Sequence, residues 1–134
     1  MAIRVFIKCG RVPVTVIHVD GDIDASTYEE FQVKADELIE NGARHILVDL
    51  AHAPFISSYG LRALYRLYNQ LRPIRPDSEL SEIEVRAGIR AGRYKSPRLK
   101  LLNLSKEARI SFEMGGFDIF IETYNDMQTA IASF

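Results

Sequence analysis

The hydrophobic positions near the start of the chain form two short runs. Residues 3–8 and 13–19 are rich in β-branched side chains that roughly alternate with polar ones, which is the pattern of β-strands. Residues 9–13 contain a glycine and a proline, and they predict the connection of a hairpin.

Three further runs predict the remaining strands. Residues 45–50 and 99–104 are almost continuously apolar, which is typical of strands covered on both faces of a sheet. Residues 118–122 predict a last short strand.

Apolar residues spaced three and four apart predict helices between these strands. The first helix begins after Ser26 or Thr27, and a glutamate three residues on suggests a capping box. It ends at Asn41–Gly42. The residues expected on its apolar face are Tyr28, Phe31, Ala35, Leu38 and Ile39.

Three more helices follow. One begins at about Ser58, where Ser57 or Ser58 is a suitable cap, and it ends at Pro73. Its apolar stripe comprises Leu61, Leu64, Tyr68 and Leu71. A short helix within 105–116 is closed by glycines. Asn125 is expected to cap the last helix, which turns Met127, Ile131 and Phe134 inward.

The resulting order is β-β-α-β-α-β-α-β-α, which predicts an α/β fold. We expect a mostly parallel mixed sheet of about five strands with four helices packed on it. Residues 1–134 are expected to form a single domain. The connection at 73–98 is atypically long. It is expected to be a surface insertion, within which residues 81–89 could form an extra strand or a partner-facing excursion.

Composition and charge exclude several classes of protein. The chain is 47% hydrophobic and 26% charged, with a net charge of −1, so no basic footprint indicates nucleic acid as a partner. The apolar runs are too short to span a membrane, and no secretory signal is visible. We therefore expect a cytoplasmic protein. Cys9 is the only cysteine, which excludes an internal disulfide and a cysteine-based zinc site.

No motif indicates a metal site or a cofactor. His18, His45 and His52 lie apart in the sequence without helical spacing, and we expect them to be ordinary structural or surface residues. Neither of the glycine-rich phosphate-binding patterns occurs. We therefore predict no metal and no cofactor.

The residues that could take part in catalysis have simpler structural roles. Asp22 and Asp24 flank a strand-to-helix turn, where capping of the helix is the simpler role. A hydrolase or transferase that uses Ser58 as nucleophile with Asp24 assisting is conceivable, but no histidine is suitably placed. We predict that the protein is not an enzyme.

One juxtaposition does suggest a function. Asp24 follows one strand, and Ser57 and Ser58 open a helix after another, so all three belong to the carboxyl ends of strands, where sites collect in parallel sheets. A helix N-terminus stabilises a phosphate group. A phosphoserine there, opposed by an aspartate, would make an electrostatic switch.

Three segments carry a resemblance to a known family. They are residues 14–27, 45–64 and 99–131. The resemblance covers nearly the whole chain except the connection at 73–98. The chain resembles the STAS domain, in particular the bacterial anti-sigma factor antagonists.

The resemblance implies a regulatory protein-binding module. Its partner would be an anti-sigma factor that is also a serine kinase, and phosphorylation would end the complex. A PP2C-type phosphatase would restore the complex. A homo-dimer is a further candidate assembly. No contact with nucleic acid or membrane is implied. The alternative is a constitutive STAS scaffold in a multi-protein signalling complex without a phosphorylation cycle.

The family's motif F-I-D-S-[ST]-G-L falls on residues 55–61, with two departures. Ser57 stands where the aspartate is usual, and Tyr59 stands at the usual phosphoacceptor position. Ser58 is then the best remaining acceptor and Ser57 the second. The residues expected to bind the partner are Asp22, Asp24, Ser57, Ser58, Tyr59, Gly60 and Arg62.

Overall fold

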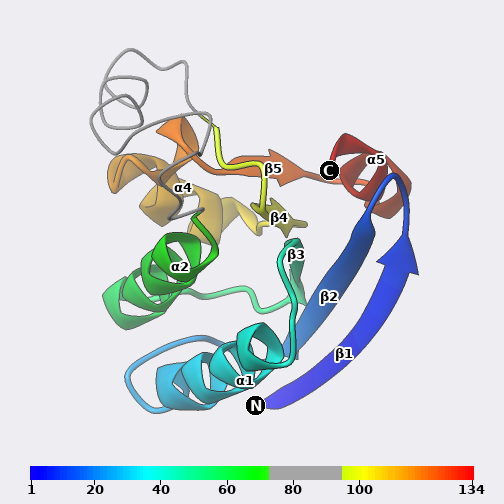
Figure 1. Ribbon diagram of the computed structural model, residues 1–134. Coiled ribbons are helices and arrows are strands. Elements are labelled where there is room, and N and C mark those ends of the chain that lie inside the picture. Colours follow the sequence, from blue (N-terminus) through cyan, green and yellow to red (C-terminus); the bar gives the residue numbers. More distant parts are fainter. Residues whose placement is uncertain (73–94) are drawn as a thin grey trace.

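A five-stranded sheet with the strand order β1-β2-β3-β4-β5 forms the centre of the fold (Figure 1). The structure is a computed structural model that describes residues 1–72 and 95–134. β1 pairs antiparallel with β2, and the remaining neighbours are parallel. The strands are β1 (Ala2–Cys9), β2 (Pro13–Asp20), β3 (Ile46–His52), β4 (Leu99–Leu102) and β5 (Glu122–Tyr124).

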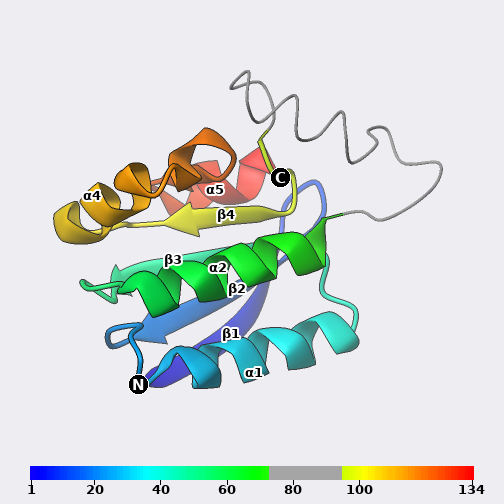
Figure 2. The same cartoon turned by 90° about the vertical axis from the view of Figure 1, so that its left-hand side faces the viewer.

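Four α-helices in the described part of the chain cover the two faces of this sheet. α1, α2 and α4 pack on one face and α5 on the other, with a separate apolar core on each side (Figures 1 and 2). Their bounds are α1 (Tyr28–Glu40), α2 (Ser58–Leu71), α4 (Lys106–Met114) and α5 (Met127–Ser133). The predicted fold class and order of elements are confirmed.

The central strand β3 is buried on both faces, as its continuous apolar run predicts. Residues 46–50 are all buried, and β2 lies beside them in parallel register. None of the helices in the described residues is long and apolar enough to cross a membrane.

The prediction of a strand at 118–122 is wrong. Phe117–Ile119 forms a short 3₁₀ helix, η1, and the strand begins only at Glu122. The backbone N–H groups of Phe120 and Ile121 both donate to the carbonyl of Phe117. This local turn buries the consecutive side chains of Phe120 and Ile121 in one core, which an extended strand would direct to opposite faces.

Two predicted helix caps are also wrong. Asp126, not Asn125, caps α5, because its carboxylate accepts hydrogen bonds from the backbone N–H of Thr129 at 2.9 Å and from its hydroxyl at 2.8 Å. α1 starts after Thr27 without a side-chain cap. The hydroxyl of Thr27 turns back and donates to the carbonyl of Asp22 at 2.7 Å, so no capping box forms.

Most of the long connection at 73–98 lies outside the described residues. This applies to residues 73–94, which include the segment 81–89. The surface insertion, the extra strand and the partner-facing excursion therefore remain predictions.

A buried lysine joins the sheet to α5. Lys100 in β4 is 4% exposed, and its ammonium group donates to the carbonyl of Ser133 at 2.8 Å and to the hydroxyl of Ser133 at 2.9 Å. Glu122 lies 3.5 Å away, and the rings of Tyr124 and Phe134 face the ammonium. Because its charge is compensated in this way, Lys100 can be buried.

We expect Lys100→Met to lower the free energy of unfolding by about 2–3 kcal/mol, because it removes the two hydrogen bonds that the buried ammonium donates to Ser133 and leaves Glu122 without its cation. Urea denaturation measures this change. Lys106→Met, at the exposed start of α4, is the control and should stay within about 0.5 kcal/mol of the unchanged protein. Equal effects of the two substitutions would contradict a stabilising role for Lys100.

Candidate functional site

Two loops at the carboxyl ends of β2 and β3 are joined side by side. Beyond the strands, Ile23 and Ile56 form an isolated parallel bridge. The N–H of Ile23 donates to the carbonyl of Phe55 at 3.1 Å, and the N–H of Ser57 donates to the carbonyl of Ile23 at 2.9 Å. The bridge therefore brings the β2–α1 loop, with its two aspartates, to the start of α2, with its serines.

The two aspartates have different roles in this arrangement. Asp22 connects the loops, since its carboxylate accepts a hydrogen bond from the N–H of Phe55 at 3.2 Å. Asp24 shapes its own loop by accepting from the N–H of Ser26 at 2.9 Å and from the Ser26 hydroxyl at 2.7 Å, and its own N–H donates to the hydroxyl of Thr27 at 3.0 Å. The bonds from Ser26 hold the pKa of Asp24 below its usual value, so this half-buried carboxylate is charged at neutral pH.

Ser57 is the N-cap of α2, and it is extended there, with φ −79° and ψ 178°. Its hydroxyl accepts from the N–H of Tyr59 at 3.2 Å and more weakly from that of Gly60 at 3.5 Å. Ser58 is the first helical residue and is exposed. In the part of the chain that the structure describes, no hydrogen bond holds the hydroxyl of Ser58.

Gly60 allows α2 to approach the β2–α1 loop. The residue is buried, and a Cβ atom at this position would lie 2.6 Å from both the carbonyl oxygen of Ile23 and the Cγ2 atom of Ile56. Any side chain would push the helix start away from the bridge. Gly60 thus lies beneath the surface formed by its neighbours, and contact with a partner remains a prediction for it.

An aromatic and cationic cluster covers the first turn of α2. The ring of Tyr59, 43% exposed, lies 5.4 Å from the ring of Tyr28, and the guanidinium of Arg62 lies 5.6 Å from the Tyr59 ring. Phe55 nearby in sequence is 51% exposed. The sequence pattern had placed Tyr28 only on the apolar face of its helix, because the contact with Tyr59 joins residues far apart in the chain.

A third loop supports the same edge of the sheet. Ser105 caps α4 by accepting from the N–H of Ala108 at 3.0 Å, and its hydroxyl donates to the carbonyl of Pro54 at 2.6 Å. The β3–α2 loop is therefore held from both sides.

A polar chain in the sheet itself is not visible in the sequence pattern. The Nδ1 of His18 lies 3.0 Å from the carboxylate of Asp49, and its Nε2 lies 3.3 Å from the Nδ1 of His52. The side-chain amide of Asn103 donates to the other oxygen of Asp49 at 3.3 Å. The parallel register of β2 and β3 brings these residues together, and the spacing of histidines along the sequence gives no sign of it.

His18 and Asp49 are buried next to the apolar core, and the polar contacts of this chain satisfy their side chains there. Asp49 and His18 are 8% and 7% exposed. Among the described residues, no group of three or more histidine, cysteine, aspartate or glutamate side chains is arranged to hold a metal ion.

We expect Gly60→Ala to destabilise the protein by about 2–3 kcal/mol, because the added methyl group overlaps the Ile23 carbonyl. Thermal and urea unfolding measure the loss. Ser58→Ala is the control, since it removes an exposed hydroxyl from the same helical turn and should change the stability little. A Gly60→Ala protein as stable as the Ser58→Ala protein would show that the close approach is not needed.

Comparison with known proteins agrees with this architecture. Residues 8–86 match the STAS domain family. The chain is 23% identical over 116 residues to BtrV of Bordetella bronchiseptica, named as an anti-sigma factor antagonist, and the match covers 87% of this chain and 82% of BtrV.

Two solved structures show the same fold. An anti-sigma factor antagonist from Mycobacterium paratuberculosis is 17% identical, with a TM-score of 0.68, and 98% of this chain and 93% of that one are covered. The phosphorylated form of SpoIIAA, a cell fate determinant of Bacillus, is 21% identical, with a TM-score of 0.61 and coverage of 97% and 96%. The protein belongs to the STAS domain family.

Proposed function

We propose that this protein is an anti-sigma factor antagonist, a regulatory binding module of the cytoplasm rather than an enzyme. Support comes from its family and from the names of BtrV and the M. paratuberculosis protein. The observation that carries the proposal is the bridge between Ile23 and Ile56, because it joins the two loops that bear the aspartates and the serines.

The proposed contact area, which we call the switch surface, combines charge with exposed aromatic rings. Tyr59 and Phe55 offer apolar area at low entropic cost, which is the chemistry of binding hot spots. Charged and polar groups surround them. The switch surface consists of Asp22, Asp24, Phe55, Ser57, Ser58, Tyr59 and Arg62.

The partner in this proposal is an anti-sigma factor with serine kinase activity, and Ser58 is its phosphorylation site. The hydroxyl of Ser57 already accepts from the N–H of Tyr59, so transfer of a phosphoryl group to it would disturb the helix cap. The exposed hydroxyl of Ser58 has no such role. SpoIIAA, which shares the fold, has a phosphorylated form. A PP2C-type phosphatase would reverse the modification.

Phosphorylation of Ser58 would act on the switch surface in two ways. It adds about two negative charges to an edge that already carries the charged Asp24. Arg62 follows Ser58 by one helical turn, so the phosphate would also compete with the Tyr59 ring for the guanidinium. Charge repulsion and displacement of Arg62 would both weaken a complex formed around Tyr59.

A second function is favoured by Tyr59 itself. This residue occupies the usual acceptor position of the family motif, and its ring contacts Tyr28 and Arg62. An exposed aromatic anchor suits a constitutive STAS scaffold that binds without a phosphorylation cycle. The two proposals share the switch surface and differ in its control.

We expect Tyr59→Ala to weaken binding to the partner kinase at least tenfold, as is typical for loss of an aromatic hot spot. Isothermal titration calorimetry against each purified kinase-type anti-sigma factor of the source organism, with ADP present, measures the affinity. Tyr65→Ala is the matched control, since Tyr65 lies on the same helix and is 46% exposed. Loss of stability is monitored by thermal unfolding. If the unchanged protein binds none of these anti-sigma factors, the proposed function is refuted.

When this protein is incubated with ATP and the kinase that binds it, one phosphate should be transferred to Ser58. Mass spectrometry detects the modified residue. Ser58→Ala should abolish the modification and keep the binding. Ser58→Glu should weaken binding by about tenfold through charge. Binding that persists without any phosphate on Ser58 or Ser57 would support the scaffold instead of the switch.

A further inference from the structure

β1 is a long strand at the outer edge of the sheet. All eight of its residues pair with β2 in one unbroken register, from Ala2 opposite Asp20 to Cys9 opposite Pro13. It ends the strand order, and within residues 1–72 and 95–134 no strand pairs with its outer side. No proline or bulge interrupts it, so its outward N–H and C=O groups can accept another strand.

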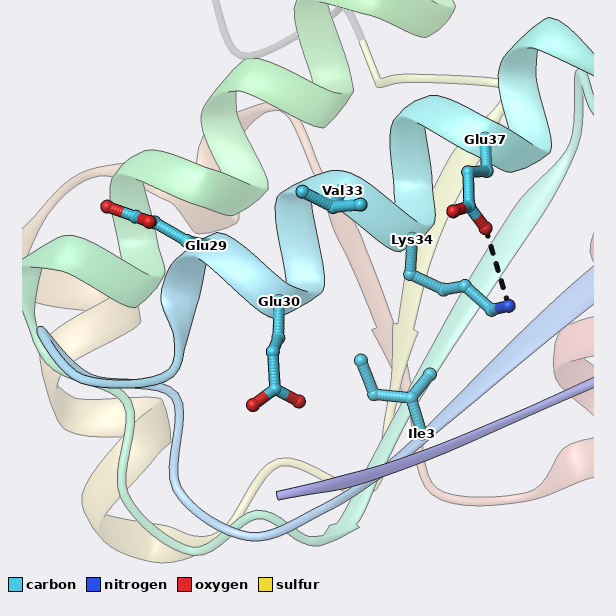
Figure 3. Close-up of a pocket in the computed structure, with 6 residues that line it drawn as sticks. All are labelled: Ile3, Glu29, Glu30, Val33, Lys34 and Glu37. Carbon is cyan, nitrogen blue, oxygen red and sulfur yellow. Dashed lines mark ion pairs between the residues drawn. The ribbon is translucent and has the colours of Figure 1, made fainter.

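The side of β1 that faces α1 is apolar and only partly covered. Ile3, Val5 and Ile7 alternate along it, and Ile7 is 66% exposed. A groove of about 540 Å³ separates Ile3 from the polar side of α1, where Val33 is 58% exposed (Figure 3). A second groove of about 350 Å³ is lined in part by Val5 and Ile7.

The other side of β1 carries two cations around one aromatic ring. Arg4, Phe6 and Lys8 lie opposite His18, Val16 and Val14 of β2 and therefore point to the same side of the sheet as one another. Phe6 is 38% exposed, and the ammonium of Lys8 already lies 5.9 Å from its ring.

We propose that this edge binds a second copy of the chain, with the two β1 strands antiparallel and the two-fold axis at Val5. The sheets of the two protomers then form one continuous sheet. Val5 lies opposite Val5 of the second copy, and Ile3 lies opposite its Ile7, which extends the apolar side over the open grooves. Arg4 lies opposite Phe6 of the second copy, where a cation–π contact is favourable.

The charges select this register. Directly opposed residues point to the same side of a sheet, so a two-fold axis must pass through a residue position of the strand. The two registers with the longest overlap are centred on Val5 and on Phe6. When the axis is at Phe6, Arg4 of each copy lies opposite Lys8 of the other copy. Like charges that face each other directly destabilise a strand pair, and this register contains two such pairs. Centring on Val5 opposes no like charges.

This edge shares no residue with the switch surface. The proposed dimer is therefore independent of the proposed function, and either can fail without the other. A dimer of this kind would carry two switch surfaces, one on each protomer.

Cysteine cross-linking tests the register. In a Cys9→Ser background, which removes the exposed native thiol, Val5→Cys should form a disulfide-linked dimer with itself on oxidation. The Ile3→Cys protein and the Ile7→Cys protein should each stay mainly without cross-links when oxidised separately. When the two proteins are mixed, they should form a disulfide-linked dimer. Self-linkage of Phe6→Cys in place of Val5→Cys would overturn the Val5-centred arrangement.

Sedimentation equilibrium tests the dimer without new cysteines. Over about 10–500 μM, the mass of the unchanged chain should rise from 15.2 kDa toward twice that value. Ile7→Lys introduces a charge at an exposed position, so folding is retained, and should weaken dimerisation at least tenfold. Ile110→Lys, at a 52% exposed position on α4, should leave it unchanged. A monomer at every concentration, or equal effects of the two lysines, would overturn the proposal.

Discussion

The parallel pairing of β2 with β3 continues past the ends of the strands, and the candidate site depends on that continuation. Here the carbonyl of Ile23 accepts from the N–H of Ser57, and the absence of a side chain at Gly60 allows α2 to begin directly against it. The distance between the charged turn and the helix start is thereby set by backbone atoms, which hold position better than side chains on loops.

The same constraint explains how the departures from the family motif are accommodated. Ser57 takes over helix capping with a hydroxyl where the family usually has aspartate, and Tyr59 extends outward to Tyr28 and Arg62. Neighbouring positions on a helix differ by about 100° of rotation, so Ser58 presents its hydroxyl in another direction than position 59 does. A kinase that uses Ser58 would therefore approach this helix from a different side.

Most of the fold could be predicted from sequence, because local patterns determine it. The continuous apolar run before Ala51 predicts a strand buried on both faces, and the structure confirms it. Asp24, Ser57 and Ser58 could be named as candidates, since the ends of strands and helices are visible in the pattern. The other candidates were named from the resemblance to the STAS family. Their contacts could not be predicted from the sequence. The rings of Tyr28 and Tyr59, and the chain from Asp49 through His18 to His52, meet through strand register and loop pairing. Such contacts join residues far apart in the chain, and no periodic pattern in the sequence indicates them.

The choice of capping groups has a consequence for the response of the protein to acid. The turn before α1 and the start of α5 depend on the carboxylates of Asp24 and Asp126, and hydrogen bonds from Ser26 and Thr129 respectively hold both pKa values below the usual aspartate value. Their stabilising contribution is complete above the pKa of an unfolded aspartate, about 4, and is lost as the pH falls through the lower folded values. The hydroxyl of Ser57 does not titrate in that range. As the pH falls below about 4, the turn before α1 and the start of α5 therefore loosen, while Ser57 continues to cap α2.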